Sequence, residues 1–147
     1  MNYRYLRAYM AGIVAPTAFL LVVLTAFCLA RFVFHVPVPI ERVIVFPMAL
    51  IPNLFGAWNM LWVGWTSSRR LSVGLHGALL PFVLVPVGFA LASLLGIVTV
   101  EGGSVVAFET ERLAFGYVAM AFPVVVAGYY LVWKYIVGFL NAVVGVE

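Results

Sequence analysis

Residues 71–100 read LSVGLHGALLPFVLVPVGFALASLLGIVTV, a run of thirty positions without Asp, Glu, Lys or Arg. A helix needs about 20 apolar residues to cross the ~30 Å hydrocarbon core of a membrane, since each residue adds ~1.5 Å. Three more charge-free stretches, at 8–30, 43–68 and 113–133, are also long enough. The sequence therefore predicts four membrane-spanning helices.

Composition indicates the same class of protein. Hydrophobic residues make up 66% of the 147 positions and charged residues only 9%, with a mean hydropathy of +1.18. A soluble domain would carry roughly 25% charged residues. We predict an all-α integral membrane protein with four transmembrane helices in a bundle, short loops and an apolar C-terminal extension. The bundle is predicted to be a single domain over residues 1–147, with spans at approximately 8–30, 43–65, 73–100 and 113–137.

Positive charge lies at the edges of the apolar stretches. The formal charge is +3 and the pI is about 9.3, yet the basic residues flank the spans instead of forming a stripe that would suit nucleic acid. The two ends and the 66–72 loop carry five basic residues, whereas the other two loops carry three. Because cytoplasmic loops are enriched in Lys and Arg, we expect a multi-pass protein of a prokaryotic inner membrane with both termini in the cytoplasm.

The first span has features of a signal peptide, because Arg4 and Arg7 precede an apolar run. That run exceeds the ~7–15 apolar residues typical of a signal peptide, which favours an uncleaved membrane anchor. Cys28 is the only cysteine, so the chain has no intrachain disulfide.

The C-terminal tail is apolar, since no charge occurs between Lys134 and Glu147. A straight helix from Leu113 to the tail would be ~51 Å long, about 20 Å longer than a membrane core. We expect the helix either to project from the membrane or to break near Gly138 or Asn141. In both cases the apolar tail favours docking against another surface.

Two asparagines are predicted to be buried in the second span. An unsatisfied amide in lipid costs several kcal/mol, so Asn53 and Asn59 should each find a partner. They lie six positions apart, about 240° around a helix, and so face different neighbours. Two interpretations remain open, namely hydrogen bonding between helices and coordination of a substrate or ion beside Pro52.

Small residues are predicted to mark helix–helix contacts. Gly88, Ala92 and Gly96 recur every four positions along the third span, and Gly56 lies on a narrow face of the second. Such faces let helix backbones approach closely in membranes. The pattern leaves open whether the partner helix belongs to this chain or to another.

Aromatic residues are predicted to lie at the membrane interface. Trp58, Trp62 and Trp65 are spaced at i, i+4 and i+7, which places them on one stripe of a helix. Together with Trp133 and Lys134 they are typical of an interfacial belt with a snorkelling lysine. The alternative is an aromatic wall for a lipid, quinone or pigment, and the identity of any cofactor stays unknown.

No catalytic or metal-binding residues are predicted. His35 and His76 are expected near opposite membrane faces, so they do not jointly bind one haem. The glutamates of the outer loops lack the spacing of a metal site. No predicted span carries Asp or Glu, which argues against a simple proton-coupled carrier. These patterns disfavour an enzyme.

A weak internal similarity relates 46–52 to 80–86, since each segment has two prolines five positions apart. Inverted repeats with broken helices occur in transporters. Proline is also common in the first turns of membrane helices, which is the simpler interpretation.

The functional hypothesis is a non-enzymatic accessory or structural subunit of a larger membrane protein complex. Its expected partners are membrane lipids and other membrane subunits or copies of itself, and not nucleic acid. The alternative is a small oligomeric transporter or channel with Asn53 and Asn59 near the pathway.

Overall fold

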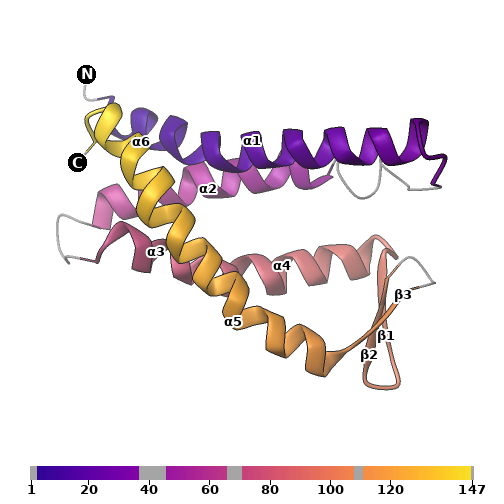
Figure 1. Cartoon of the computed structure of the whole chain (residues 1–147). Coiled ribbons are helices and arrows are strands. Elements are labelled where there is room, and N and C mark those ends of the chain that lie inside the picture. Colours follow the sequence, from indigo (N-terminus) through magenta and orange to yellow (C-terminus); the bar gives the residue numbers. More distant parts are fainter. Residues whose placement is uncertain (1–2, 37–45, 66–70, 108–110, 147) are drawn as a thin grey trace.

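The computed structural model describes residues 3–36, 46–65, 71–107 and 111–146. Within these ranges the protein is mostly helical and has one small sheet (Figure 1). The elements in chain order are α1 (Arg4–Phe32), α2 (Phe46–Trp65), α3 (Val73–Leu79), α4 (Pro81–Leu94), β1 (Val98–Glu101), β2 (Ser104–Ala107), β3 (Glu111–Ala114), α5 (Phe115–Leu131), the π-helical segment η2 (Val132–Val137) and α6 (Gly138–Val143).

Helices α1 and α2 form an antiparallel hairpin (Figure 1). Glycines bring the two backbones together. A Cβ on Gly12 would lie only 2.7 Å from the carbonyl oxygen of Phe55, and a Cβ on Gly56 would lie 2.5 Å from the Tyr9 ring. Neither position has room for a side chain, so these glycines are what permits the close approach of the helices.

Helices α3 and α4 form a nearly continuous rod that is interrupted at Pro81. Proline has no N–H to donate and suits the first turn of a helix, so α4 begins there. The rod ends after Leu94 because Gly96 adopts a left-handed conformation, with φ at +67°. The Gly96 amide donates to the Ser93 carbonyl and the next amide donates to that of Ala92, which closes a Schellman motif.

Residues 98–101, 104–107 and 111–114 form a three-stranded antiparallel sheet in the order β1-β2-β3. This differs from the expectation of a helix to residue 100, a loop, and a new helix from residue 113. The difference has two local causes. The segment is rich in β-branched residues, and Gly102 and Gly103, with φ at +55° and +79°, supply the two-residue turn between β1 and β2. The sheet thus separates α4 from α5.

One continuous helix runs from Phe115 to Val143 through α5, η2 and α6. Of the two alternatives for this helix, the one with a break near Gly138 or Asn141 is not seen. The helix changes hydrogen-bond pattern instead, because η2 is wound as a π-helix and the Gly138 amide donates to the Trp133 carbonyl, five residues earlier.

The end of the chain packs back on α1. The Arg7 guanidinium donates to the Val144 carbonyl at 3.1 Å, and that of Arg4 to the Val146 carbonyl at 3.5 Å. The Val146 side chain is buried in a cluster with Ala8, Trp62 and Val63. Part of the apolar tail is therefore covered by the protein's own helices, and both ends of the chain lie at one end of the molecule (Figure 1).

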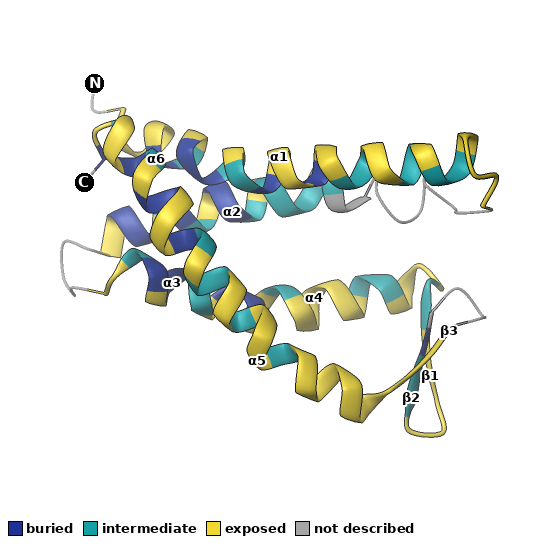
Figure 2. Cartoon of the chain, viewed as in Figure 1, coloured by how far each residue is buried: buried dark blue, intermediate teal, exposed yellow. Residues whose placement is uncertain are grey.

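Burial is concentrated where the chain ends meet (Figure 2). We call this region the closed end. It comprises α3, η2, α6 and the adjoining parts of α1 and α2. The open arm comprises α4, α5 and the sheet. On the open arm, α4 buries only Pro81 and α5 buries no residue.

Three described helices are long and apolar enough to cross a membrane, namely Arg4–Phe32, Val73–Leu94 and Phe115–Val143. Helix α2 is not among them. It has 20 residues, two of them asparagines and three of them tryptophans. The structure thus supports a helical protein with three candidate membrane spans.

Candidate functional site

An asparagine pair joins three helices at the closed end. Asn59 on α2 and Asn141 on α6 are both fully buried. Their side-chain amides exchange two hydrogen bonds, of 2.7 and 3.1 Å, and the Asn59 amide also donates to the Ala8 carbonyl at 2.7 Å. These contacts meet the need of a buried amide for partners.

His76 on α3 lies between two tryptophans. Its ring stacks on Trp58 with centroids 4.9 Å apart and meets Trp133 edge-on at 5.9 Å. The His76 Nε2 lies 2.9 Å from the Trp58 carbonyl oxygen, so the proton belongs on that nitrogen. The Trp58 indole donates in return to the His76 carbonyl at 2.9 Å. This reciprocal pair holds α3 against α2.

Trp133 is the largest fully buried side chain among the described residues and lies in η2. It fits because Gly77 on α3 has no Cβ, since any side chain there would overlap the indole ring. Its ring centroid lies 5.6 Å from that of Phe55. Within the described ranges, the Trp133 Nε1 is the buried side-chain polar atom without a hydrogen-bond partner. Such π-helical turns recur at functional sites.

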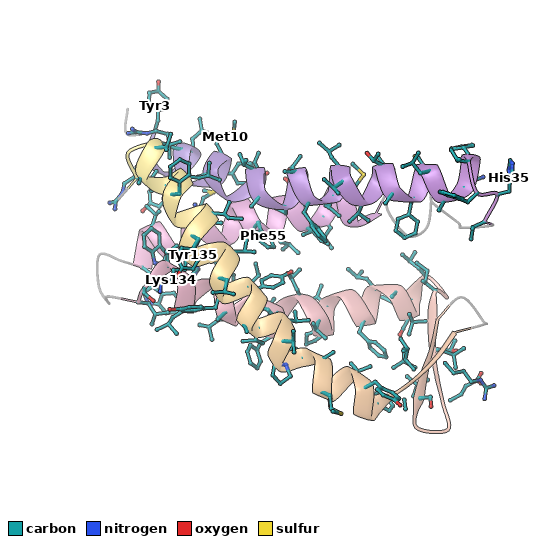
Figure 3. The ribbon with its side chains drawn as sticks, viewed as in Figure 1. Tyr3, Met10, His35, Phe55, Lys134 and Tyr135 are labelled. Carbon is teal, nitrogen blue, oxygen red and sulfur yellow. The ribbon has the colours of Figure 1, made fainter. Side chains whose placement is uncertain are left out.

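Lys134, the next residue of η2, is exposed. Its ammonium nitrogen lies 5.6 Å from the Tyr130 ring centroid and 5.2 Å from that of Tyr135. A Cβ on Gly74 would lie 2.9 Å from the Tyr130 ring and 3.1 Å from Cβ of Lys134, so the absence of a side chain at Gly74 lets Tyr130 and Lys134 pack on α3. We call Tyr130, Lys134 and Tyr135 the lysine–tyrosine cluster, and Figure 3 shows its labelled members, Lys134 and Tyr135, at the closed end.

The two asparagines of α2 lie in different surroundings. Asn59 is buried in the closed end, whereas Asn53 is exposed and accepts a hydrogen bond from the Tyr9 hydroxyl. Asn59 bonds to Asn141 and Ala8, whereas Asn53 bonds to Tyr9.

The residues predicted to pack helices also divide into two groups. Gly56 contacts Tyr9 on α1, whereas nothing lies within 4 Å of a Cβ built on Gly88 or Gly96. Ala92 is half-buried, and Gly96 lies beyond α4 in the turn that ends it. The use of the Gly88–Ala92 face in packing stays a prediction.

The predicted interfacial residues differ in burial. Trp65 and Lys134 are exposed, Trp58 is half-buried, and Trp62 and Trp133 are buried. The Trp62 indole donates to the Leu71 carbonyl at 3.1 Å. The expected stripe of Trp58, Trp62 and Trp65 therefore does not form one open wall, because Trp62 is buried and Trp58 is half-buried against His76.

The sequence pattern did not single out His76 or Asn141 as central residues. Two local signals point to them. Gly74 and Gly77 flank His76, and such small residues accompany bulky rings on a neighbouring helix. Asn141 is an isolated amide in an apolar segment, the same signal that identified Asn59.

The two histidines lie far apart. His35 lies beyond the end of α1, away from the closed end that contains α3 and His76 (Figure 3). Across the part of the chain that the structure describes, no group of three or more His, Cys, Asp or Glu residues is placed to hold a metal ion.

No protein family, curated protein or solved structure matches this chain.

Proposed function

We propose that this chain is a non-enzymatic structural subunit of a larger membrane protein complex. The closed end holds the chain together, and the open arm contacts helices of another subunit. In this proposal α2 is a fourth span beside the three candidate spans, and the protein is embedded in a prokaryotic inner membrane. Both chain ends lie in the cytoplasm, in accord with the excess of basic residues at the ends and in the 66–72 loop.

A contrast between glycines carries the proposal. At four helical glycines of the α1–α2 hairpin and α3, a neighbouring residue occupies the space beside the Cα, so that an added Cβ would lie within 3 Å of that neighbour. They are Gly12, Gly56, Gly74 and Gly77. For three helical glycines of the open arm, no atom of the described residues lies within 4 Å of an added Cβ: Gly88, Gly116 and Gly128. Small residues in membrane helices serve close helix contacts, whereas contact with lipid does not require them.

The exposed surface of the open arm also supports contact with helices of another subunit. Large apolar side chains are exposed on both of its helices, including Phe82, Phe89, Leu94, Tyr117, Met120 and Val124. Neither α4 nor α5 has an extensive described contact with the α1–α2 hairpin, and α5 slants away from it toward the sheet (Figure 1). Within the described chain they therefore have little packing of their own, which helices of a partner would supply.

The transporter alternative has less support. Its pathway would use Asn53 and Asn59, but the Asn59 amide is fully buried and already bonded to Asn141 and Ala8. Releasing it for a solute would leave the Asn141 amide without its partner in the interior, which costs about 1–3 kcal/mol.

Co-purification tests the proposal. The tagged full-length protein, extracted from its native membranes in a mild detergent, should migrate with larger membrane proteins, identified by mass spectrometry. Gly88→Ile and Ala92→Ile should weaken that association, because a branched side chain on this face separates close backbones. Val87→Ile is the matched control, since Val87 is already branched and exposed on the same helix.

Two results would contradict the proposal. One is a purified protein that contains only copies of this chain and moves a solute into liposomes, which would favour the transporter alternative. The other is equal association for Ala92→Ile, Gly88→Ile and Val87→Ile.

A further inference from the structure

The lysine–tyrosine cluster has features that packing alone does not require. Lys134 is exposed, and its ammonium nitrogen lies 5.6 Å from the Tyr130 ring centroid and 5.2 Å from that of Tyr135. The ammonium is also placed to donate to both phenol oxygens. Each phenol then keeps one O–H to donate, so the cluster offers one positive charge and at least two hydroxyl donors.

The cluster is held in place from beneath. Gly74 allows the Tyr130 ring and the Lys134 stem to lie directly on the backbone of α3, at 2.9 and 3.1 Å from an added Cβ. The two residues are four apart on the same helix, and the π-helical winding of η2 sets where Tyr135 lies relative to them. The donors therefore come from one rigid element and not from a loop.

Charge at this end of the molecule favours an anion. The described basic side chains near the chain ends are Arg4, Arg7 and Lys134, and both arginines donate to carbonyls at the end of α6. Within the described ranges, acidic residues occur only in the sheet of the open arm, at Glu101 and Glu111. That sheet lies away from the closed end (Figure 1), and its described ion pair joins Glu101 to Arg112.

The apolar surroundings favour a lipid over a free anion. Leu131 lies one turn before Lys134 on the same helix and is exposed, and Leu75 and Leu79 of the neighbouring α3 are exposed as well. An acyl chain that runs from the cluster along α3 and α5 would cover these side chains. Lysines at the cytoplasmic boundary of membrane helices attract anionic lipid headgroups in this way.

We propose that Tyr130, Lys134 and Tyr135 form a binding site for the phosphate group of an anionic phospholipid. The Lys134 ammonium supplies the charge, the tyrosine hydroxyls supply further donors, and the acyl chains lie against Leu131 and the exposed leucines of α3. This inference rests on the membrane setting of the proposed function, but it does not depend on a partner subunit.

The test measures lipid binding to the full-length protein purified in a mild detergent. Native mass spectrometry titrates it with dioctanoyl phosphatidylglycerol, with dioctanoyl phosphatidylcholine and with inorganic phosphate. The variants are Lys134→Gln, Lys134→Arg and Tyr135→Phe. The matched controls are Arg112→Gln, an exposed cation in the sheet, and Tyr117→Phe, an exposed tyrosine of α5 outside the cluster.

Lys134→Gln should weaken phosphatidylglycerol binding about fivefold, the value of one lysine near an anionic surface. Lys134→Arg should retain binding, and Tyr135→Phe should weaken it about threefold through the loss of one hydrogen bond. Both controls should bind as the unaltered protein does. Because all of these side chains are exposed, their melting temperatures should match that of the unaltered protein.

Three outcomes would overturn the inference. In the first, phosphatidylglycerol and phosphatidylcholine bind equally well. In the second, Lys134→Gln and Arg112→Gln lose the same amount of phosphatidylglycerol binding. In the third, millimolar inorganic phosphate displaces the lipid. A separate extraction with sodium carbonate tests whether the protein is embedded in the membrane. Its release from membranes by carbonate would contradict both proposals. Failure of the partner proposal alone would leave these lipid measurements unchanged.

Discussion

Asn59 and Asn141, 82 positions apart in the sequence, face each other in the interior and exchange two hydrogen bonds. Neither side chain is exposed. The pair connects α2 to the last helix of the chain, and the further bond from Asn59 to the Ala8 carbonyl adds α1. These contacts join both ends of the chain to its second helix.

Removing one partner of this pair should destabilise the protein more than removing both. Asn141→Leu leaves the Asn59 amide with unmet hydrogen-bonding groups, which should cost about 1–3 kcal/mol. The Asn59→Leu, Asn141→Leu double variant should lose less than the sum of the two single variants, because it leaves no orphaned amide in the pair. Thermal unfolding in detergent, arranged as a double-mutant cycle, measures the coupling. Strict additivity would mean that the two amides do not interact.

Two glycine substitutions should have opposite consequences. Gly77→Ala should destabilise the protein by about 2–4 kcal/mol or prevent folding, since the new Cβ overlaps the buried Trp133 ring. Gly88→Ala should be neutral or stabilising by up to about 1 kcal/mol, because it lies in a helix with open space around it. Melting temperatures of the two purified variants compare them directly, and similar losses would contradict the described packing of α3 on η2.

Deletion of residues 138–147 should destabilise the remaining chain. The deletion removes Asn141 and Val146, which cover Asn59 and Ala8. The free energy of unfolding should fall further than in Asn141→Leu, by at least ~1.5 kcal/mol, which is what the burial of one valine contributes. A melting curve of the truncated protein equal to that of the full chain would show that the tail serves association only.

The orientation is tested by labelling of single cysteines in a Cys28→Ala background. A cysteine at Ser68, in the basic loop, should be shielded from an impermeant thiol reagent in intact cells, and one at Thr99, exposed in β1, should react. Thr99 is preferable to Gly102 or Gly103, where a positive φ makes a side chain strained. Labelling at Ser68 with protection at Thr99 would reverse the proposed topology.

The helices of the chain follow from local sequence, whereas some of their boundaries depend on details that a charge count overlooks. The run 71–100 lacks charge throughout, yet its helix ends at Leu94 because Gly96 closes a Schellman motif. The valines that follow are apolar like the helix residues before them, but the Gly102–Gly103 turn pairs them into strands. Hydropathy does not distinguish an apolar strand from an apolar helix, whereas turn glycines do.

For the candidate site, the sequence identified single residues but not their partners. Asn59 was expected to need a hydrogen-bond partner, since any buried amide does. That the partner is Asn141 depends on the π-helical winding of η2, which changes the face that the following residues present. Trp133 was expected at the membrane interface, which stays a prediction, but that its ring is buried in the protein depends on the space that Gly77 leaves for it on α3.

By itself, the sequence determined what depends on composition and spacing along the chain: the apolar helical segments, the confinement of charge to their edges, and the residues too polar to be left unpaired in an apolar setting. Only the tertiary structure decided which faces are filled. The α1–α2 hairpin, α3, η2 and α6 close on one another through glycines and a buried amide pair, and α4 and α5 remain uncovered. The physical reason is that apolar residues are spread almost evenly around these helices, so hydrophobicity alone does not select a contact face. The contact faces are selected by steric fit and hydrogen-bond geometry, which act only when two helices meet.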